Sequence, residues 1–267
     1  MDETISVIGA GVIGGAIVKS LLKSGRYKRI IATRRRVEKL RELEELGAVT
    51  TGDNRWAARE ADIVFICVKP GDVGKVLEEI REEIKGKLVV STAATIPLDF
   101  YKSIVPEAKF VRTMPNLCLL VQESFTAYCC SRDVTEDDKK KVRNVLKVLG
   151  RCEEVEEKYM DAITALSGSA PAYVSIIIEG LMYAGLKVGL PRDLALESSA
   201  QALLGTAKLI LETKLSSSQI KDMVTTPGGV TVEGVYQIED GGVRTALIRA
   251  VEAATEKCKK IRKFWSS

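Results

Sequence analysis

The stretch Thr4-Ile5-Ser6-Val7-Ile8-Gly9-Ala10-Gly11-Val12-Ile13-Gly14 decides the fold of this chain. A short apolar run leads directly into a G-x-G-x-x-G turn, and residues with helical spacing follow. In such a unit the first glycine permits the tight turn, the second lets a pyrophosphate approach the backbone, and the third packs the helix against the strand. The helix N-terminus favours the phosphate. We therefore expect a dinucleotide site that includes Gly9, Gly11, Val12, Ile13 and Gly14.

The end of the second predicted strand indicates which dinucleotide is bound. This strand, Arg29 to Thr33, is followed by Arg34-Arg35-Arg36 instead of the acidic residue that would bind a ribose hydroxyl. Guanidinium groups pair with phosphate through forked hydrogen bonds, so we expect Thr33 and Arg34 to bind NADPH, with NADH as the alternative cofactor. A solvated surface run is the other interpretation of the arginines. Asn54 follows the short third strand and is expected on the adenosine side, where a turn residue would look the same.

The composition excludes several kinds of site. The 267 residues are 46% hydrophobic and 28% charged with a net charge of +4, which is typical of a globular chain with a sizeable core. Because histidine is absent, His-based triads and His-ligated metal sites are excluded, and we expect no metal. The six cysteines form no C-x-x-C pair and are expected to be reduced packing residues. The basic clusters lack interleaved aromatic residues, which argues against nucleic-acid binding.

No segment predicts export or membrane insertion. No charged region precedes an apolar signal core near the first residue, and the longest uncharged stretch, Ala162 to Ile178, is interrupted by Ser-Gly-Ser-Ala-Pro. We therefore expect a cytoplasmic protein that binds a small molecule and no membrane.

Alternation of apolar and charged segments predicts an α/β fold. Apolar, β-rich runs recur up to Cys130 and are separated by charge-rich segments with helical spacing, which predicts a Rossmann-type, doubly wound parallel sheet. After Gly150 the pattern changes to helices separated by Gly, Pro and Ser. We expect a dinucleotide-binding domain at 1–158 and an all-α domain for dimerisation and substrate binding at 159–267.

The helical half contains segments that are apolar on more than one face. Ala172 to Leu186 holds a single charged residue, Glu179. A helix that is apolar nearly all round must be enclosed by others, and a domain of about a hundred residues seldom encloses it alone. We therefore expect burial against a second subunit in an obligate dimer.

Two further stretches are placed to border a cofactor. Val68-Lys69-Pro70 follows a strand at the carboxyl edge of the sheet, where ligands of such folds bind, although a strand-end lysine in solvent explains Lys69 equally well. In the second stretch, Ser167 to Pro171, we expect Ser169 or Ala170 at or next to the N-cap of the long helix and Pro171 in its first turn. The small residues there form either an ordinary helix cap or a surface that a flat cofactor ring can approach closely.

A second glycine-rich turn, Thr225-Thr226-Pro227-Gly228-Gly229-Val230-Thr231, precedes a predicted helix at 232–239. Its amides and hydroxyls converge at a helix N-terminus, which favours an anion such as a carboxylate. A plain capped loop explains the proline and the glycines but not three threonines, so the anion site is favoured.

These motifs together resemble the pyrroline-5-carboxylate reductase family over the whole chain. Besides the stretches above, the resemblance rests on Arg112-Thr113-Met114-Pro115-Asn116 and Gly189-Leu190-Pro191, and its most specific part is the Thr225 to Thr231 block. The resemblance implies hydride transfer from NADPH or NADH to the imine carbon of 1-pyrroline-5-carboxylate, giving L-proline. It fits the missing histidine, because a cyclic imine is protonated near neutral pH and the enzyme supplies mainly orientation and electrostatics.

The resemblance also assigns roles to individual residues. Thr231 would be the catalytic residue that hydrogen-bonds the ring nitrogen, and Thr226 with the amides of Gly229 and Val230 would hold the substrate carboxylate. The nicotinamide would be bordered by the turn that contains Ser167, Ser169 and Ala170. Members of the family form homodimers through an interlocking helical domain, often assembled into rings of dimers.

Some positions depart from the family pattern. Leu117-Cys118 stand where the family has Thr-Pro, and Ala170 stands where glycine is usual. Two alternatives therefore stay open: a reductase of a related cyclic imine or ketimine acid, and a non-catalytic NADP-binding regulator. Retention of Thr231 within a complete turn argues against the regulator.

Overall fold

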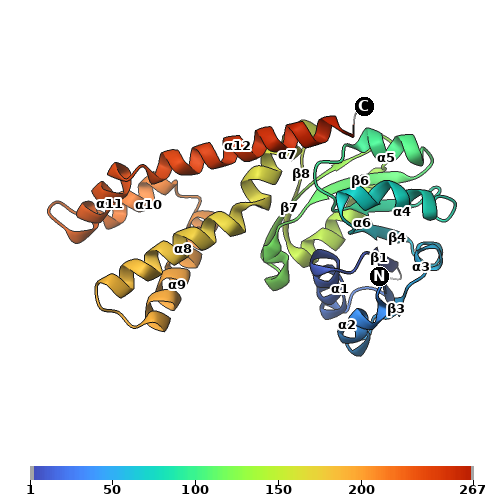
Figure 1. Ribbon diagram of the computed structural model, residues 1–267, viewed down its shortest axis with the longest axis horizontal. Coiled ribbons are helices and arrows are strands. Elements are labelled where there is room, and N and C mark those ends of the chain that lie inside the picture. The colour runs from blue at the N-terminus through green and yellow to red at the C-terminus, as the bar shows by residue number, and fades with distance from the viewer. Residues whose placement is uncertain (1–2, 266–267) are drawn as a thin grey trace. The chain divides into compact units, whose positions relative to one another are not determined.

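The structure is a computed structural model that describes residues 3–265, and the chain divides into two compact units. The first unit runs to Ser169 and takes in the chain again from Ala254, whereas the second unit is Ala170–Ala253. Figure 1 shows the elements of both units in chain order.

An eight-stranded sheet forms the centre of the first unit (Figure 1). Its spatial order is β3-β2-β1-β4-β5-β6-β7-β8. The strands are β1 (Thr4–Ile8), β2 (Arg29–Thr33), β3 (Val49–Thr51), β4 (Ile63–Ile66), β5 (Leu88–Ser91), β6 (Lys109–Met114), β7 (Ser124–Cys130) and β8 (Gly150–Glu154). The order reverses between β1 and β4, which makes a topological switch point at the G-x-G-x-x-G turn and confirms the doubly wound fold.

One junction departs from the all-parallel sheet that the sequence predicts. β7 lies antiparallel to β6, and β8 is parallel to β7. Residues 115–123 connect β6 to β7 and contain only the short 3-10 helix η3 (Leu117–Val121). A parallel crossover needs a connection of about a dozen residues or more, so this short one returns the chain in the opposite direction.

Helices cover both faces of the sheet. They are α1 (Val12–Ser24), α2 (Arg41–Glu45), α3 (Asn54–Glu60), α4 (Val73–Glu79), α5 (Leu98–Ile104), α6 (Glu136–Leu146) and α7 (Met160–Ile163). Side chains alternate along the strands: Ile5 and Val7 join the core formed with α1 and α6, whereas Ile8 joins the core formed with α3, α4 and α5. The central strands β1, β4 and β5 are therefore buried on both faces, as their apolar composition predicts.

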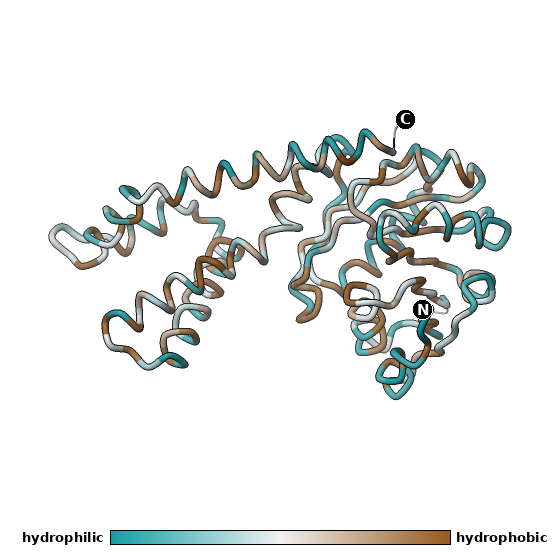
Figure 2. Tube along the Cα trace, in the orientation of Figure 1, coloured by the Kyte–Doolittle hydropathy of each residue, from teal (hydrophilic) through white to brown (hydrophobic). Residues whose placement is uncertain are grey.

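The second unit consists of helices. They are α8 (Ala170–Lys187), α9 (Arg192–Thr213), α10 (Ser217–Val224), α11 (Val230–Asp240) and the first part of α12 (Val243–Lys263). α8 and α9 lie side by side in Figure 1. Among residues 170–253 only Met182 and Ala195 are buried. Figure 2 shows many hydrophobic residues along α8, so this unit leaves an apolar surface that its own helices do not cover.

The segment around Ser167 does not begin a helix. A π-helical turn, η6 (Thr164–Gly168), continues α7 and runs into α8. The Ser169 N–H donates to the Thr164 carbonyl at 3.1 Å, the i to i+5 bond of a π turn. α8 begins at Ala170, so Ser169 and Ala170 lie at its start and Pro171 in its first turn, as predicted; what the sequence did not predict is that η6 joins α8 to α7 without a loop. Pro171 cannot donate a backbone hydrogen bond, and the wider π turn is placed just before it.

The continuous helical run has a second consequence. Residues 157–187 are long and apolar enough to cross a membrane by length and composition, and 11% of the most apolar window is buried inside the chain. The Ser-Gly-Ser-Ala-Pro stretch therefore does not interrupt the run as expected. The interior of a subunit interface suits such a helix as well as a bilayer does.

Candidate functional site

A cavity of about 810 Å³ opens at the carboxyl edge of the sheet, where β1, β2 and β4 end. It collects residues that the sequence placed at the cofactor: Gly9, Gly11, Thr33, Arg34, Asn54, Val68 and Lys69. Pro70 follows as the first residue of the 3-10 helix η2 (Pro70–Asp72). The position agrees with ligand binding at the switch point of a doubly wound sheet.

Two glycines of the first turn have no room for a side chain, whereas the remaining one does. Gly9 has a φ of +91°, and a Cβ there would lie 2.7 Å from Val68 Cγ1. A Cβ on Gly14 would lie 2.5 Å from the Gly9 carbonyl oxygen, whereas a Cβ on Gly11 would meet no atom closer than 4.0 Å. Gly9 and Gly14 are thus required by the close backbone packing, and Gly11 leaves room on the cavity side.

The N-terminus of α1 faces this turn without a competing anion. Gly11 is its N-cap residue, no side chain caps it, and its first turn contains no acidic residue. The amides of Gly9 and Ala10 donate to the Thr33 carbonyl and that of Gly11 to the Gly9 carbonyl, so the amides left for a ligand are those that follow Gly11 in the first turn of α1. Such a helix N-terminus is suited to a phosphate group.

Basic side chains dominate the rim of the cavity. The basic residues are Arg34, Arg35, Arg36, Lys39, Lys69 and Lys75, and the acidic ones are Asp72 and Glu79. Arg35 pairs with Asp72 at 2.9 Å. Among residues 3–265 the structure shows no ion pair for Arg34 or Arg36. These two guanidinium groups are therefore available to a phosphate.

A chain of hydrogen bonds joins the ends of β2 and α4 to the start of α3 at the cavity. The Thr33 hydroxyl donates to Asn54 Oδ1 at 2.6 Å, and Asn54 Nδ2 donates to the two carboxylate oxygens of Glu79 at 3.1 and 3.2 Å. Thr33 is buried, and Asn54 is the first residue of α3. Sequence reasoning missed Glu79, because the last residue of α4 carries no motif that would distinguish it from a surface carboxylate.

Cys67 lies directly behind the glycine turn. A Cβ on Gly14 would come within 3.0 Å of its Cβ. Burial raises the pKa of the Cys67 thiol to about 12, although a hydrogen bond with Thr92 acts in the opposite direction. The thiol is therefore protonated at neutral pH and serves packing, as predicted.

The end of β6 holds the π turn in place. Asn116 Nδ2 donates to the backbone oxygen of Ser167 at 3.2 Å and to its hydroxyl at 3.3 Å. A Cβ on Gly168 would lie 2.6 Å from the Met114 methyl carbon, so the two elements are in close contact. The structural role of Asn116 could have been found from its place after a strand at the carboxyl edge of the sheet. Ser167 and Ser169 belong to this first unit, and Ala170 begins the second.

The second glycine-rich turn lies in the helical unit. Gly229 is the N-cap residue of α11 and provides no side-chain cap, and its N–H donates to the Thr226 carbonyl at 3.0 Å. A Cβ on Gly229 would collide with the Thr226 hydroxyl. The helix begins at Val230, two residues earlier than predicted, which places Thr231 in its first turn. Thr226, Gly229, Val230 and Thr231 are thus gathered at one uncapped helix N-terminus.

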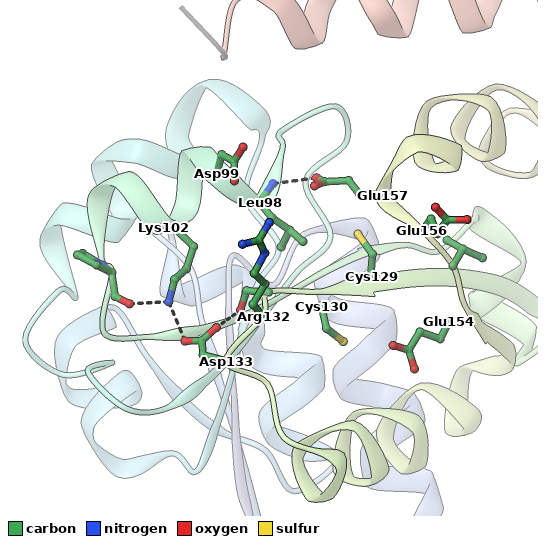
Figure 3. Close-up of a pocket in the computed structure, with 13 residues that line it drawn as sticks. Leu98, Asp99, Lys102, Cys129, Cys130, Arg132, Asp133, Glu154, Glu156 and Glu157 are labelled. Atoms are coloured by element: carbon green, nitrogen blue, oxygen red, sulfur yellow. Dashed lines mark hydrogen bonds and ion pairs between the residues drawn. The ribbon is translucent and has the colours of Figure 1, made fainter.

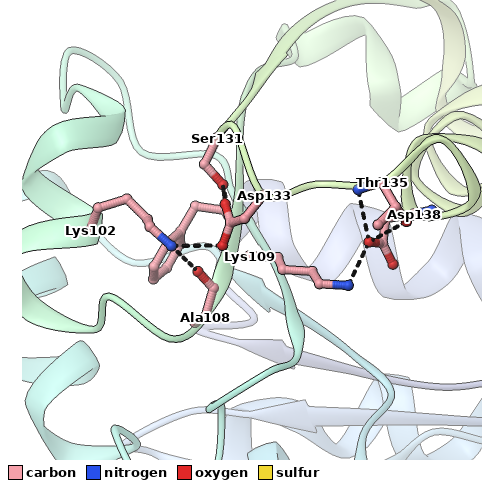
Figure 4. A network of polar contacts seen from close by, with 8 residues as sticks. Lys102, Ala108, Lys109, Ser131, Asp133, Thr135 and Asp138 are labelled. Atoms are coloured by element: carbon pink, nitrogen blue, oxygen red, sulfur yellow. Dashed lines mark hydrogen bonds and ion pairs between the residues drawn. The ribbon is translucent and has the colours of Figure 1, made fainter.

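A larger cavity, of about 1120 Å³, contains none of the predicted site residues. It lies between α5, the end of β7 and residues 154–157 (Figure 3). Lys102 pairs with Asp133 at 2.7 Å, and the Ser131 hydroxyl donates to Asp133 at 2.5 Å (Figure 4). Burial raises the pKa of Asp133, but the hydrogen bonds from Lys102 and Ser131 outweigh it and hold the pKa below its ordinary value. These groups are engaged with one another, so cavity size alone does not identify the site.

Within residues 3–265 no group of three or more Cys, Asp or Glu side chains could hold a metal ion.

Comparison with known proteins identifies close relatives. Residues 157–261 match the family model described as pyrroline-5-carboxylate reductase dimerisation, and residues 4–95 match NADP oxidoreductase, coenzyme F420-dependent. A pyrroline-5-carboxylate reductase of Methanosarcina acetivorans is 36% identical and covers 98% of this chain and 99% of its own.

Two solved structures agree with this similarity. A pyrroline-5-carboxylate reductase from Coxiella burnetii has a TM-score of 0.91 at 32% identity and covers 97% of this chain and 98% of its own. The Plasmodium falciparum pyrroline carboxylate reductase with NADP bound has a TM-score of 0.87 at 30% identity, with 97% and 98% coverage.

Proposed function

The chain belongs to the pyrroline-5-carboxylate reductase family, and we propose that it transfers hydride from NADPH to the imine carbon of 1-pyrroline-5-carboxylate, which gives L-proline. The observation that carries this conclusion is similarity over nearly the full length to reductases of that name. The chain also contains both the Gly9 to Gly14 turn and the Thr225 to Thr231 turn, which supports the same function.

The residues around the smaller cavity fit NADPH. The uncapped N-terminus of α1 and the open side of Gly11 suit the pyrophosphate, and Arg34 suits the 2′-phosphate. Thr33 and Asn54 would hold the adenosine end, and Val68, Lys69 and Pro70 would border the nicotinamide half. The remaining contacts would come from Ser167, Ser169 and Ala170. NADPH supplies the hydride when bound, and these residues orient it.

The turn before α11 fits the anionic imine. The Thr226 hydroxyl and the amides of Gly229 and Val230 would bind the substrate carboxylate at the positive end of the helix. Thr231 would hydrogen-bond the ring nitrogen and so fix which face of the ring meets the cofactor. Since the cyclic imine is protonated near neutral pH, the chain needs no histidine to supply the proton.

We also propose the limits of the two domains, the assembly of the chain and its location. The dinucleotide-binding domain is 1–158, and the helical domain for dimerisation and substrate binding is 159–267, supported by the dimerisation family model at residues 157–261. The exposed apolar side chains of α8 support a homodimer. Assembly into a ring of dimers and a cytoplasmic location are the finer parts of the same proposal.

A panel of imines tests the function. NADPH oxidation would be followed with 1-pyrroline-5-carboxylate and with a six-membered cyclic imino acid, and each would be repeated with NADH. We expect rapid oxidation with the five-membered ring and a preference for NADPH. Oxidation only with the larger ring would assign a related substrate and point to Leu117-Cys118 as the cause. Cofactor binding without any oxidation would instead favour the regulator.

A further inference from the structure

We propose that Glu79 is a positioning residue for the cofactor, an assignment that rests on the proposed function for the presence of NADPH in this cavity. Glu79 accepts two hydrogen bonds from the Asn54 amide and so fixes its orientation. Asn54 in turn accepts from the Thr33 hydroxyl and fixes the direction of that hydroxyl. Thr33 and Asn54, held in this way, present oriented oxygen atoms to the adenosine ribose.

The three residues come from separate elements that meet only in the folded unit. Thr33 ends β2, Asn54 begins α3, and Glu79 ends α4. The Arg55 Nε donates to the backbone oxygen of Glu79 at 2.7 Å, which ties the end of α4 to the start of α3. The Glu79 side chain is therefore held against Asn54 from both its backbone and its carboxylate.

The acceptor character of Glu79 sets the direction of the whole chain of hydrogen bonds. An ionised carboxylate can only accept, so the amide NH₂ of Asn54 must face Glu79. Asn54 Oδ1 then faces Thr33 and accepts the single proton of its hydroxyl at 2.6 Å. With that proton committed, the Thr33 oxygen and Asn54 Oδ1 offer only lone pairs toward the cavity.

Lone pairs suit hydroxyls and not phosphates. A ribose hydroxyl can donate to Thr33 or Asn54, whereas a phosphate oxygen near these atoms would face acceptor groups alone. The 2′-phosphate must then be bound by the arginines, with Arg34 and Arg36 lining the same cavity. The cavity thus separates a hydroxyl-reading side from a phosphate-reading side.

The charge of Glu79 by itself would weaken cofactor binding, so its presence in the cavity needs another explanation. A carboxylate among the lining groups opposes the binding of an anionic cofactor, and Asp72, the other acidic lining residue, is offset by Arg35 at 2.9 Å. Glu79 pairs with an amide and leaves its charge in place. The hydrogen bonds that orient Asn54 compensate for this repulsion.

The test replaces Glu79 by a side chain of similar length without an acceptor. In Glu79→Met we expect the dissociation constants of NADPH and NADH, and the KM of each, to rise by about three- to tenfold, the effect of one net hydrogen bond. kcat should stay unchanged because the adenosine end is remote from the imine. Glu79→Gln keeps one acceptor for Asn54, so its dissociation constants and KM values should rise by less than about twofold.

Two controls separate positioning from a structural effect. Glu78→Met changes the neighbouring exposed carboxylate, which pairs with Arg81 at 3.9 Å and does not line the cavity, and should leave both dissociation constants unchanged. In an Asn54→Ala background Glu79→Met should cause no further weakening of cofactor binding, because the group that it positions is gone and only the loss of the repelling charge remains.

Several results would overturn the assignment. Equal effects of Glu79→Met and Glu79→Gln, confined to tighter NADPH binding, would show that Glu79 acts only by its charge. An undiminished weakening in the Asn54→Ala background would show that Glu79 acts independently of Asn54. Because binding is measured by direct cofactor titration, a wild-type protein that binds NADPH without reducing the imine would refute the function and leave this test valid.

Discussion

The two units treat apolar side chains in opposite ways. In the first, Phe65 and Ile17 are fully buried within a core that lies on both faces of the sheet. In the second, Ile176 and Tyr236 are each 67% exposed although their helices are regular. The difference shows that a sequence can specify helices completely while their packing surface is left to another copy of the chain.

This division also separates the two halves of the chemistry. The predicted cofactor residues lie almost entirely in the unit that completes its own core, whereas the predicted substrate turn lies in the unit that does not. Cofactor binding should therefore depend little on assembly. Reduction of the imine should depend on it strongly.

The largest effect is expected from a charge placed on the exposed face of α8. Ile176→Glu would bury a carboxylate twice in a symmetric interface, and we expect monomers and a fall in kcat/KM of more than about a hundredfold. Sedimentation and the imine assay measure both. Leu46→Glu, at a leucine of the first unit that is 53% exposed, is the matched control. An Ile176→Glu protein of unchanged mass and turnover would remove this face from the interface.

The next effect concerns the substrate turn. Thr231→Val removes one hydroxyl at the ring nitrogen, so kcat should fall about tenfold or more while the dissociation constant of NADPH is unchanged. Thr225→Val is the control, because the Thr225 hydroxyl already donates to the Lys221 carbonyl at 2.7 Å. Equal kinetics of the Thr231→Val and wild-type proteins would exclude Thr231 from the reaction.

A smaller effect tests the phosphate-reading side of the self-contained unit. Arg34→Ala should weaken NADPH about tenfold more than NADH, because only NADPH carries the 2′-phosphate. Arg35→Ala should change the ratio less, since Arg35 is 78% exposed and already paired with Asp72. Titration with both cofactors gives the ratio. A parallel loss for NADPH and NADH would show that Arg34 does not contact this phosphate.

The smallest effect is a chemical one within the core of the first unit. Burial raises the pKa of each of the Cys67, Cys129 and Cys130 thiols to about 12, so all three are protonated at pH 8. Iodoacetamide should therefore leave them unlabelled in the native protein and label them after unfolding, as read by mass spectrometry. Native labelling of Cys67 would show instead that the glycine turn opens.

The sequence predicted the elements whose cause is local. The apolar runs gave the strands of the parallel part of the sheet, and the glycine turn gave the switch point, because Gly9 and Gly14 are required by backbone packing visible in the motif itself. The excess of apolar residues on α8 likewise predicted an uncovered face.

Features set by distant contacts could not be predicted in the same way. The antiparallel β7 follows from a short connection whose length becomes meaningful only once β6 and β7 are known to pair. Pro171 correctly marked the start of α8, but no local pattern marked the π turn that joins this helix to α7 through the bond from Ser169 to Thr164. Glu79 reaches Asn54 across 25 residues, and no local pattern marks that contact.

The most direct measurement is the mass of the wild-type protein in solution by sedimentation, combined with turnover of 1-pyrroline-5-carboxylate on the same sample. If the helical unit is completed by a second copy, the active species will have twice the chain mass of 29.1 kDa or an even multiple of it. A species of 29.1 kDa with full turnover would contradict the account, because the exposed face of α8 would then serve no assembly.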